Sequence, residues 1–347
     1  MSRIILTGGG TGGHVIPILS LLESLQKEGF SCQFIGSKNG IEKELIKEIP
    51  YFEISTGKFR RYLSVKNLTD PFKVVKGVGD SLKIMKRIKP DVVFSKGGFV
   101  TVPVVLAAKM LKIPVVIHES DITPGLANKI AIPFAKYVCT SFPETVSKIG
   151  DKAILTGTPI RKEILNGDKK RLSYSLRNLP IVLITGGSTG SLAINNAVWN
   201  NIESLLADYN IVHLTGKGKM NEDIKRAGYI QLQYANDEMA HLYDLADVVV
   251  SRAGANTLAE LLALKKPNLL IPLPLSRSRG DQIENAKSFA EQGFSEILQE
   301  ENLSELKKCL DNLYKKRTKY QLSMAEAEQK DSVSAIIGIL KNFQKKI

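Results

Sequence analysis

The chain has 347 residues, of which 43% are hydrophobic and 24% charged, a balance typical of a globular protein long enough for two domains. Its formal net charge of +13 indicates an anionic partner, such as a nucleic acid, a phosphorylated substrate or an acidic membrane surface, unless the charge serves solubility alone. Three widely spaced cysteines and four scattered histidines do not form the pattern of a disulfide framework or a metal site. We expect neither a signal peptide nor a membrane-spanning segment, because the first residues read as a strand and no apolar stretch is long enough to cross a bilayer.

Short apolar runs alternate with helical patterns along most of the chain. The sequence predicts strands at Ile4–Thr7, Cys32–Ile35, Val92–Ser95, Val115–His118, Tyr137–Thr140, Ile181–Thr185, Asn210–Leu214, Val248–Ser251 and Asn268–Pro272. It predicts helices between several of them, including Pro17–Glu28, Leu192–Leu206 and Asn256–Leu264. Unbroken apolar strands that alternate with helices are typical of a parallel sheet covered on both faces.

The two halves of the chain repeat three motifs in the same order. Each half has an apolar run ending in Thr-Gly-Gly, then an Asp-Val-Val segment, then a Leu-Lys-x-Pro segment just before a strand. Turn residues and a Lys/Arg cluster mark a boundary between the halves near Thr158–Arg171. The sequence therefore predicts an α/β protein built from two doubly wound parallel-sheet domains.

Two glycine loops, Gly8–Gly13 and Gly186–Ser191, each join a predicted strand to a predicted helix. Such a corner presents backbone N–H groups and the positive end of a helix dipole, which suit a phosphate-sized anion. The first loop contains GxGxxG, but the strand that ends at Ser37 carries no acid to hold a ribose, so the dinucleotide interpretation loses most of its support. No GxxxxGK[ST] motif indicates a P-loop nucleotidase.

Polar residues follow several predicted strands. His14 stands at a helix start, where the positive helix end favours a neutral imidazole that can act as a base, although a capping or packed histidine is the alternative. The segment His118–Asp121 points either into a functional crevice or into a capped turn. Asn256 and Thr257 open another helix one turn before Glu260, whose carboxylate could accept two ribose hydroxyls or merely complement the helix dipole.

The segment Lys58–Pro90 departs from the regular α/β pattern. It contains ten Lys/Arg residues against two Asp, interleaved with apolar side chains. A basic face beside exposed apolar residues is typical of a protein that lies on an anionic membrane, and we assign Phe72, Lys73, Val75 and Lys76 to this surface. The alternative is an amphipathic core helix with a solvated basic side.

The chain contains, in order, GGGTGGHVIP, KGGFVTVPVV, PVVIHESDITPGLANK, GTPIR, ITGGSTGS, SRAGANTLAE and SRGDQIENA. Together these motifs resemble the MurG family, the undecaprenyldiphospho-muramoylpentapeptide N-acetylglucosaminyltransferases of bacterial cell-wall synthesis. The resemblance implies the GT-B fold, with two Rossmann-like domains at 1–160 and 161–325 that face across a cleft, and a helix at 326–347 that packs back on the first domain. It also implies transfer of GlcNAc from UDP-GlcNAc to the C4 hydroxyl of MurNAc in lipid I, with inversion at the anomeric carbon.

The resemblance also implies roles for individual residues. The catalytic residues would be His14, as the base for the acceptor hydroxyl, and Glu119. The implied donor-binding residues are Thr11, Gly12, Gly13, Asp121, Arg161, Ser188, Ala235, Ala255, Asn256, Thr257, Glu260 and Gln282. Two positions depart from some family members: Asp121 replaces an asparagine, so it cannot donate a hydrogen bond to a sugar as an amide does, and Phe99 replaces a tyrosine.

We expect no obligatory metal and no other cofactor, because no DxD pair follows a strand of the predicted nucleotide-binding domain. Backbone N–H groups and Arg161 would then meet the charge on the leaving diphosphate. The implied partners are UDP-GlcNAc, lipid I and the anionic membrane leaflet, with the protein peripheral on the cytoplasmic face of the cell membrane. No nucleic-acid partner is expected, because no basic and aromatic patch lies near the glycine loops. The alternatives are another GT-B glycosyltransferase with a lipid acceptor and a non-catalytic UDP-sugar-binding protein.

Overall fold

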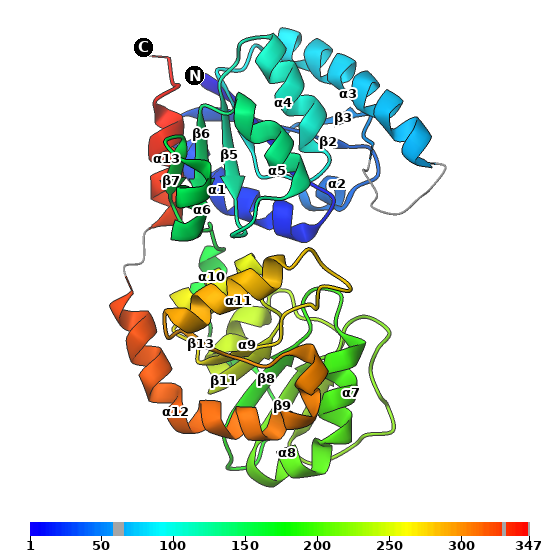
Figure 1. Cartoon of the computed structure of the whole chain (residues 1–347), viewed down its shortest axis with the longest axis vertical. Helices are drawn as coiled ribbons and strands as arrows, with labels where there is room; N and C mark the ends of the chain where they lie inside the picture. The colour runs from blue at the N-terminus through cyan, green and yellow to red at the C-terminus, as the bar shows by residue number, and fades with distance from the viewer. Residues whose placement is uncertain (58–65, 328–330, 346–347) are drawn as a thin grey trace. The chain divides into compact units, whose positions relative to one another are not determined.

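The chain folds into two compact units, each a parallel β-sheet with helices on its faces (Figure 1). The computed structural model describes residues 1–57, 66–327 and 331–345. The first unit comprises Met1–Arg161 with Lys330–Ile347, and the second comprises Lys162–Gln329.

The first unit contains a seven-stranded sheet in the order β3-β2-β1-β4-β5-β6-β7, and every neighbouring pair is parallel. Its strands are β1 (Ser2–Thr7), β2 (Phe30–Ser37), β3 (Tyr51–Ile54), β4 (Val92–Ser95), β5 (Val115–Glu119), β6 (Tyr137–Thr140) and β7 (Ala153–Leu155). Its helices are α1 (Ile16–Lys27), α2 (Ile41–Leu45), α3 (Lys66–Ile88), α4 (Thr101–Met110), α5 (Leu126–Ala131), α6 (Pro143–Ile149) and α13 (Ser332–Lys341). The chain reverses its direction of progress through the sheet between β1 and β4, which is where a doubly wound sheet places its ligand crevice.

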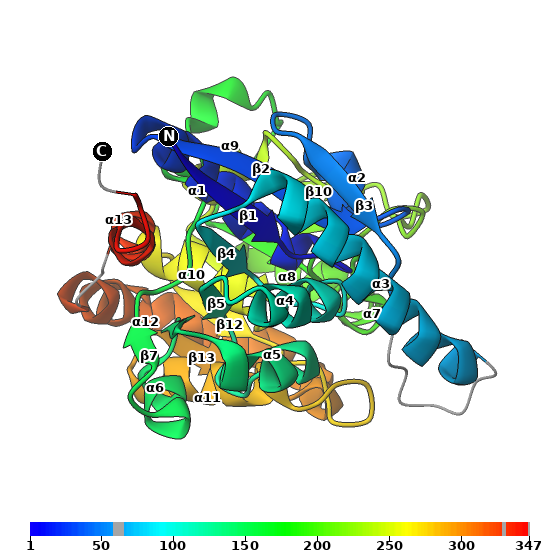
Figure 2. The ribbon, with the colours of Figure 1, turned by 90° about the horizontal axis from the view of Figure 1, so that it is seen from above.

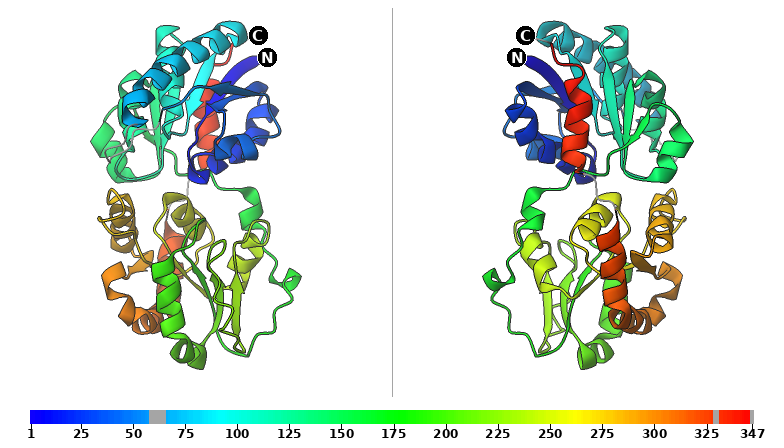
Figure 3. Two further views of the ribbon diagram at one scale, coloured as in Figure 1. Left: turned by 90° about the vertical axis from the view of Figure 1, so that its right-hand side faces the viewer. Right: turned by 90° about the vertical axis from the view of Figure 1, so that its left-hand side faces the viewer.

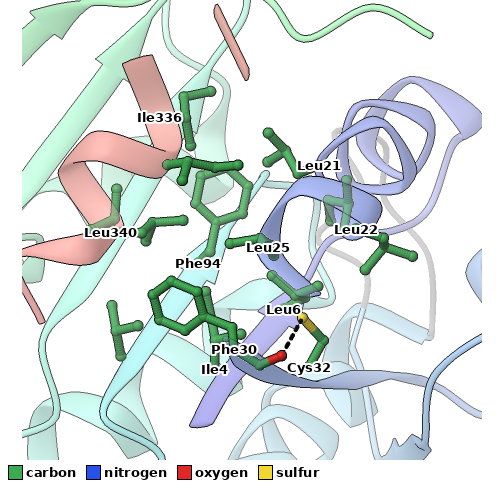
Figure 4. Close-up of a cluster of buried hydrophobic side chains, with 14 of the residues drawn as sticks. Ile4, Leu6, Leu21, Leu22, Leu25, Phe30, Cys32, Phe94, Ile336 and Leu340 are labelled. Atoms are coloured by element: carbon green, nitrogen blue, oxygen red, sulfur yellow. Dashed lines mark hydrogen bonds between the residues drawn. The ribbon is translucent and has the colours of Figure 1, made fainter. Parts of the chain in front are cut away.

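Helix α13 belongs to the first unit although it lies at the other end of the sequence (Figure 3). Its Ile336 and Leu340 are fully buried beside Leu21 and Leu25 of α1 and Phe94 of β4 (Figure 4). Each such side chain contributes roughly 1.5–3 kcal/mol of hydrophobic free energy. The C-terminal helix is therefore part of the first unit's core.

The second unit contains a six-stranded sheet in the order β10-β9-β8-β11-β12-β13, again with every neighbouring pair parallel. Its strands are β8 (Ile181–Thr185), β9 (Asn210–Leu214), β10 (Tyr229–Leu232), β11 (Val248–Ser251), β12 (Asn268–Leu270) and β13 (Ser295–Ile297). Its helices are α7 (Leu192–Asn200), α8 (Ile202–Asp208), α9 (Met239–Leu245), α10 (Ala255–Ala263), α11 (Asp281–Glu291) and α12 (Leu306–Glu326). Here the switch point falls between β8 and β11.

The two doubly wound parallel sheets confirm the predicted fold class, and each predicted strand is present. The unpredicted strands are β3, β7, β10 and β13, which are the outermost strands of the two sheets. Edge strands are only partly covered, so β3, β10 and β13 each include a polar residue in place of an unbroken apolar run. The fourth, β7, is apolar but only three residues long. The helix predicted at Leu192–Leu206 is interrupted at Asn201, whose side-chain amide donates to the carbonyl oxygen of Ala197.

The boundaries of the units differ slightly from those in the sequence analysis. The first unit extends to Arg161, one residue beyond the expected end at residue 160. Glu326 belongs to the second unit rather than to a returning helix, because it forms the last turn of α12, and α12 packs against the strands of the second sheet.

Candidate functional site

Two loops meet at the switch point of the first sheet. The first glycine loop (Gly8–Gly13) follows β1, and the backbone N–H of Gly9 donates to the carbonyl oxygen of Gly97, after β4, at 3.3 Å. A Cβ on Gly98 would overlap the carbonyl oxygen of Gly9 and lie 3.2 Å from Nδ1 of His14, and Gly98 has a φ of +88°. Only glycine adopts this conformation without strain. The packing of the two loops therefore fixes the surroundings of His14.

His14 lies at the end of a 3-10 turn, η1 (Gly12–His14), which leads directly into α1. The side chain is half-buried, and its Nδ1 lies 3.0 Å from Oγ1 of Thr11, which orients the ring. Thr11 and Gly13 are exposed at the tip of the loop. The predicted residues Thr11, Gly12, Gly13 and His14 therefore form one accessible corner that combines polar backbone with an imidazole.

A buried carboxylate holds the first glycine loop from behind. Glu42 of α2 is fully buried and accepts hydrogen bonds from the backbone N–H of Gly10 at 3.2 Å and of Ser37 at 3.1 Å. Burial and the nearby charge of Glu42 raise the pKa of the Tyr51 hydroxyl. β2 ends without an acid, yet Glu42 supplies one five residues later. This carboxylate binds the protein's own backbone and makes the first loop a poorer site for a phosphate.

Glu119 shapes the turn after β5. Its side chain is buried, and Oε1 accepts from the backbone N–H of Asp121 at 3.0 Å. Its Oε2 accepts from the backbone N–H of Gly125 at 3.0 Å and from Nδ2 of Asn128 at 2.9 Å. These bonds fix the backbone that carries the half-buried Asp121. In this structure Glu119 has the contacts of a positioning residue.

Lys96 is a buried cation that the sequence analysis did not select. It follows β4, is only 2% exposed, and its Nζ donates to Oγ of Ser120. Burial lowers the pKa of Lys96 to about 8, although Glu119 and Asp121 oppose the shift. The ammonium of Lys96 therefore lies near the carboxylate of Asp121. Some family members have an asparagine amide at the position of Asp121. The Lys-Gly-Gly motif was the only signal of Lys96 in the sequence.

The second glycine loop (Gly186–Ser191) connects β8 to α7. Ser188 is exposed at the tip of the loop, and Ser191 is the N-cap of α7, because its Oγ accepts from the backbone N–H of Ile194 at 3.4 Å. The same Oγ accepts a hydrogen bond from Nη2 of Arg252 at 2.6 Å. This loop therefore presents a helix N-terminus with a cation bound to its cap.

Arg252 fastens several parts of the second unit together. It is buried at the end of β11, and its Nη1 donates to the carbonyl oxygens of Ile271 at 3.1 Å and Pro272 at 3.2 Å. Its Nη2 pairs with Glu300, which also pairs with Arg277. Burial, with the nearby charge of Arg277, lowers the pKa of Arg252 to about 10, so the guanidinium remains charged at neutral pH.

The start of α10 lies beside the second glycine loop. Ser251 of β11 is opposite Thr185 of β8 in the register of the sheet, so the segments that follow the two strands are neighbours. Four predicted donor-binding residues lie on α10. Ala255 is buried, whereas Asn256, Thr257 and Glu260 are half-buried. Oε2 of Glu260 accepts a hydrogen bond from the Tyr243 hydroxyl at 3.1 Å, which fixes the carboxylate.

The remaining predicted donor residues lie elsewhere. Ala235 is half-buried after the edge strand β10, which lies two strands from β8. Gln282 opens α11, and its Oε1 accepts from the backbone N–H of Leu273 at 3.1 Å, which leaves the amide nitrogen as the end that donates. Arg161 is the last residue of the first unit. The structure therefore groups the predicted residues into one set on each unit.

Helix α3 presents a mixed basic and apolar surface. Phe72 and Val75 are 79% and 70% exposed, and Lys73 and Lys76 are exposed beside them. The opposite side of the helix packs against α4 (Figure 2) and includes the buried residues Gly77, Ser81 and Met85. The first part of the predicted basic segment, residues 58–65, lies outside the described residues.

Within residues 1–57, 66–327 and 331–345, no helix is both long and apolar enough for a membrane crossing. In the same part of the chain, no three His, Cys, Asp or Glu side chains are grouped so that they could share a metal ion.

Two parallel α/β units with a glycine-loop corner at each switch point are the architecture found in two-domain glycosyltransferases. Models of the glycosyltransferase family 28 N-terminal and C-terminal domains match residues 4–140 and 181–337. The chain belongs to glycosyltransferase family 28.

Comparison with individual proteins gives matches along the whole chain. A protein of Clostridium botulinum named UDP-N-acetylglucosamine–N-acetylmuramyl-(pentapeptide) pyrophosphoryl-undecaprenol N-acetylglucosamine transferase is 52% identical over 99% of this chain and 100% of its own length. A protein of the same name from Lachnoclostridium phytofermentans is 51% identical over the full length of both chains. The crystal structure of Acinetobacter baumannii MurG is similar with a TM-score of 0.76 and 27% identity, over 99% of this chain and 100% of that one. The fold is thus the predicted GT-B type.

Proposed function

We propose that the protein is an enzyme that transfers GlcNAc from UDP-GlcNAc to the C4 hydroxyl of MurNAc in lipid I, the undecaprenyl-diphosphate-linked precursor of peptidoglycan. The observation that carries this proposal is the full-length identity to relatives that have this activity in their names. The polar corners at the two switch points supply the groups that the reaction needs.

The second unit has the charge distribution of a nucleoside-diphosphate site. Its glycine loop carries a helix N-terminus capped by Ser191, and the buried guanidinium of Arg252 lies directly behind that cap. The first glycine loop instead holds the carboxylate of Glu42. The arrangement on the second unit stabilises a diphosphate more strongly, because the carboxylate of Glu42 reduces the positive potential of the first loop. The nucleoside diphosphate of the donor therefore binds on the second unit, with Ser188 at the phosphates and Glu260 accepting hydrogen bonds from the ribose. The donor-binding residues proposed on the first unit, Thr11, Gly12, Gly13 and Asp121, would meet the rest of the donor.

The first unit supplies the group that accepts the acceptor's proton. In the transfer, the C4 oxygen of MurNAc bonds to C1 of GlcNAc, the bond from C1 to the UDP oxygen breaks, and the C4 proton passes to His14. A neutral imidazole at a helix start is suited to this step and is expected to contribute about 10²–10⁴ in rate. Thr11 orients the ring. Attack opposite the leaving group inverts the anomeric carbon.

Glu119, Lys96 and Asp121 form the first unit's part of the site. Glu119 holds the backbone of the turn, and Lys96 balances the charge of Asp121, which lies on that turn. In this arrangement Asp121 accepts hydrogen bonds from sugar hydroxyls rather than donating them.

The charge on departing UDP is met without a metal ion in this proposal. Backbone N–H groups of the second loop, the α7 dipole and the side chain of Arg161 provide the stabilisation. We therefore propose that no metal and no other cofactor is obligatory.

Helix α3 is the proposed contact with the membrane that contains the lipid-linked acceptor. Phe72 and Val75 would enter the interface while Lys73 and Lys76 meet anionic headgroups, each lysine worth about 1 kcal/mol. The protein would then be peripheral on the cytoplasmic leaflet.

The test is transfer of radiolabel from UDP-[¹⁴C]GlcNAc to a short-chain lipid I analogue. Wild type should form a disaccharide-lipid product, and His14→Ala should lower kcat by about 10²–10⁴. His241→Ala, which removes a histidine of α9 in the second unit, is the matched control and should retain the wild-type rate. Absence of product with wild type would overturn the proposed reaction. A His14→Ala rate within about two-fold of wild type would overturn only the role of His14 as the base.

A further inference from the structure

The loop after β9 is in close contact with the second glycine loop. The half-buried Lys219 donates from Nζ to the carbonyl oxygen of Thr189 at 2.7 Å and of Gly190 at 3.4 Å. A Cβ on Gly190 would overlap the carbonyl oxygen of Thr215, so glycine is required for this approach. The lysine thus binds the back of the loop whose front carries Ser188.

A chain of buried hydrogen bonds fixes the loop from which Lys219 extends. Nδ2 of Asn195, on α7, donates to the carbonyl oxygen of Thr215 at 2.9 Å, and Oδ1 of Asn195 lies 3.1 Å from Nε2 of His213. These three residues are fully buried. The lysine therefore extends from a segment that is tied to the same helix whose N-terminus the glycine loop forms.

The position of the ammonium has a physical consequence for anion binding. A glycine loop binds phosphate only if its N–H groups face the anion and its carbonyl oxygens face away. Two carbonyl oxygens of this loop accept from Lys219, and such charge-assisted hydrogen bonds are about twice as strong as neutral ones. The lysine both turns the carbonyl oxygens away and places a positive charge behind the loop.

We propose that Lys219 is a positioning residue for the donor diphosphate, acting through the carbonyl oxygens of Thr189 and Gly190 rather than by direct contact with the phosphates. This inference rests on the proposed function, since it assigns the diphosphate of a nucleotide donor to the second glycine loop. It predicts that the lysine matters for phosphate recognition and not for recognition of the nucleoside.

The experiment measures binding of UDP and of uridine by calorimetry to wild type, Lys219→Met and Lys217→Met. Lys217 is an exposed lysine of the same loop, so its substitution removes the same charge without removing the two carbonyl contacts. Lys219→Met should weaken UDP binding by about 10-fold, equivalent to about 1.4 kcal/mol, and leave uridine binding unchanged. Lys217→Met should change UDP binding by less than about two-fold.

Two results would overturn the inference. Equal weakening of UDP binding in both variants would show that only long-range charge is involved, and equal weakening of UDP and uridine in Lys219→Met would show a general structural defect. Fluorescence of Trp199 checks that the variant's second unit is folded. If Lys219→Met does not fold, Lys219→Gln, which keeps a donor without the charge, replaces it under the same criteria. Failure of wild type to bind UDP would instead contradict the proposed function.

Discussion

Acidification should destabilise the second unit through His213, a buried histidine of β9. Trp199 Nε1 donates to the Tyr229 hydroxyl at 2.9 Å, and that hydroxyl lies 3.0 Å from Nδ1 of His213. Nε2 of the same ring lies 3.1 Å from Oδ1 of Asn195. The direction of the neighbouring bonds assigns Nδ1 as the acceptor and Nε2 as the donor, so the ring fits this site as the neutral imidazole.

The size of the effect follows from the pKa of His213, which burial lowers from 6.5 to about 3. Between these values the unfolded chain binds a proton and the native ring does not, so the free energy of unfolding falls as the pH falls through this window. At about 1.36 kcal/mol per pKa unit, the full loss is about 5 kcal/mol, of which about 2 kcal/mol is reached at pH 5. Replacement of His213 by a side chain that does not titrate should remove this dependence of the free energy of unfolding on pH.

The assay is urea unfolding at pH 7.5 and pH 5, followed by tryptophan fluorescence. Trp199 is the only tryptophan of the chain, and its ring centroid lies 6.3 Å from that of His213, so the signal reports on the second unit. The free energy of unfolding should fall by about 2 kcal/mol more in wild type than in His213→Gln over this pH range. The reasoning would be refuted if wild type and His213→Gln differed in free energy of unfolding by the same amount, within about 0.5 kcal/mol, at both pH values.

Three further predictions concern the membrane, the first glycine loop and metal dependence. The double substitution Phe72→Asp and Val75→Asp should lower turnover of a lipid-linked acceptor and flotation with anionic liposomes. UDP binding, measured by calorimetry, should be unchanged. Equal loss of all three would point to misfolding instead. Gly98→Ala should lower kcat by about 10–100-fold, because the new Cβ would overlap the carbonyl oxygen of Gly9 and crowd His14. The UDP affinity of this variant should match that of wild type. Full activity would contradict the contact between the two loops. Treatment with a chelator should leave the initial rate of GlcNAc transfer unchanged, and a rate that collapses and returns with added Mg²⁺ or Mn²⁺ would disprove the metal-free proposal.

The cations and anions around the glycine loops could not be predicted from sequence. Glu42 reaches Gly10 across 32 positions and Arg252 reaches Ser191 across 61. Each of these charged residues looks like an ordinary surface residue in the sequence, since no local pattern records a partner so far along the chain. The two Thr-Gly-Gly corners therefore appear equivalent in sequence, although one is backed by a carboxylate and the other by a guanidinium.

The amino-acid sequence by itself determined the central strands, several of the helices and the two corners. Burial on both faces of a parallel sheet requires unbroken apolar runs, and a tight turn into a helix requires glycine, so both are written locally. The family resemblance, and no local pattern, predicted the return of the C-terminal helix to the first unit. The tertiary structure alone decided the edge strands and the charges behind each corner. These features depend on which segments the topology brings together, and hydrogen bonds or ion pairs between distant residues leave no periodicity in the chain.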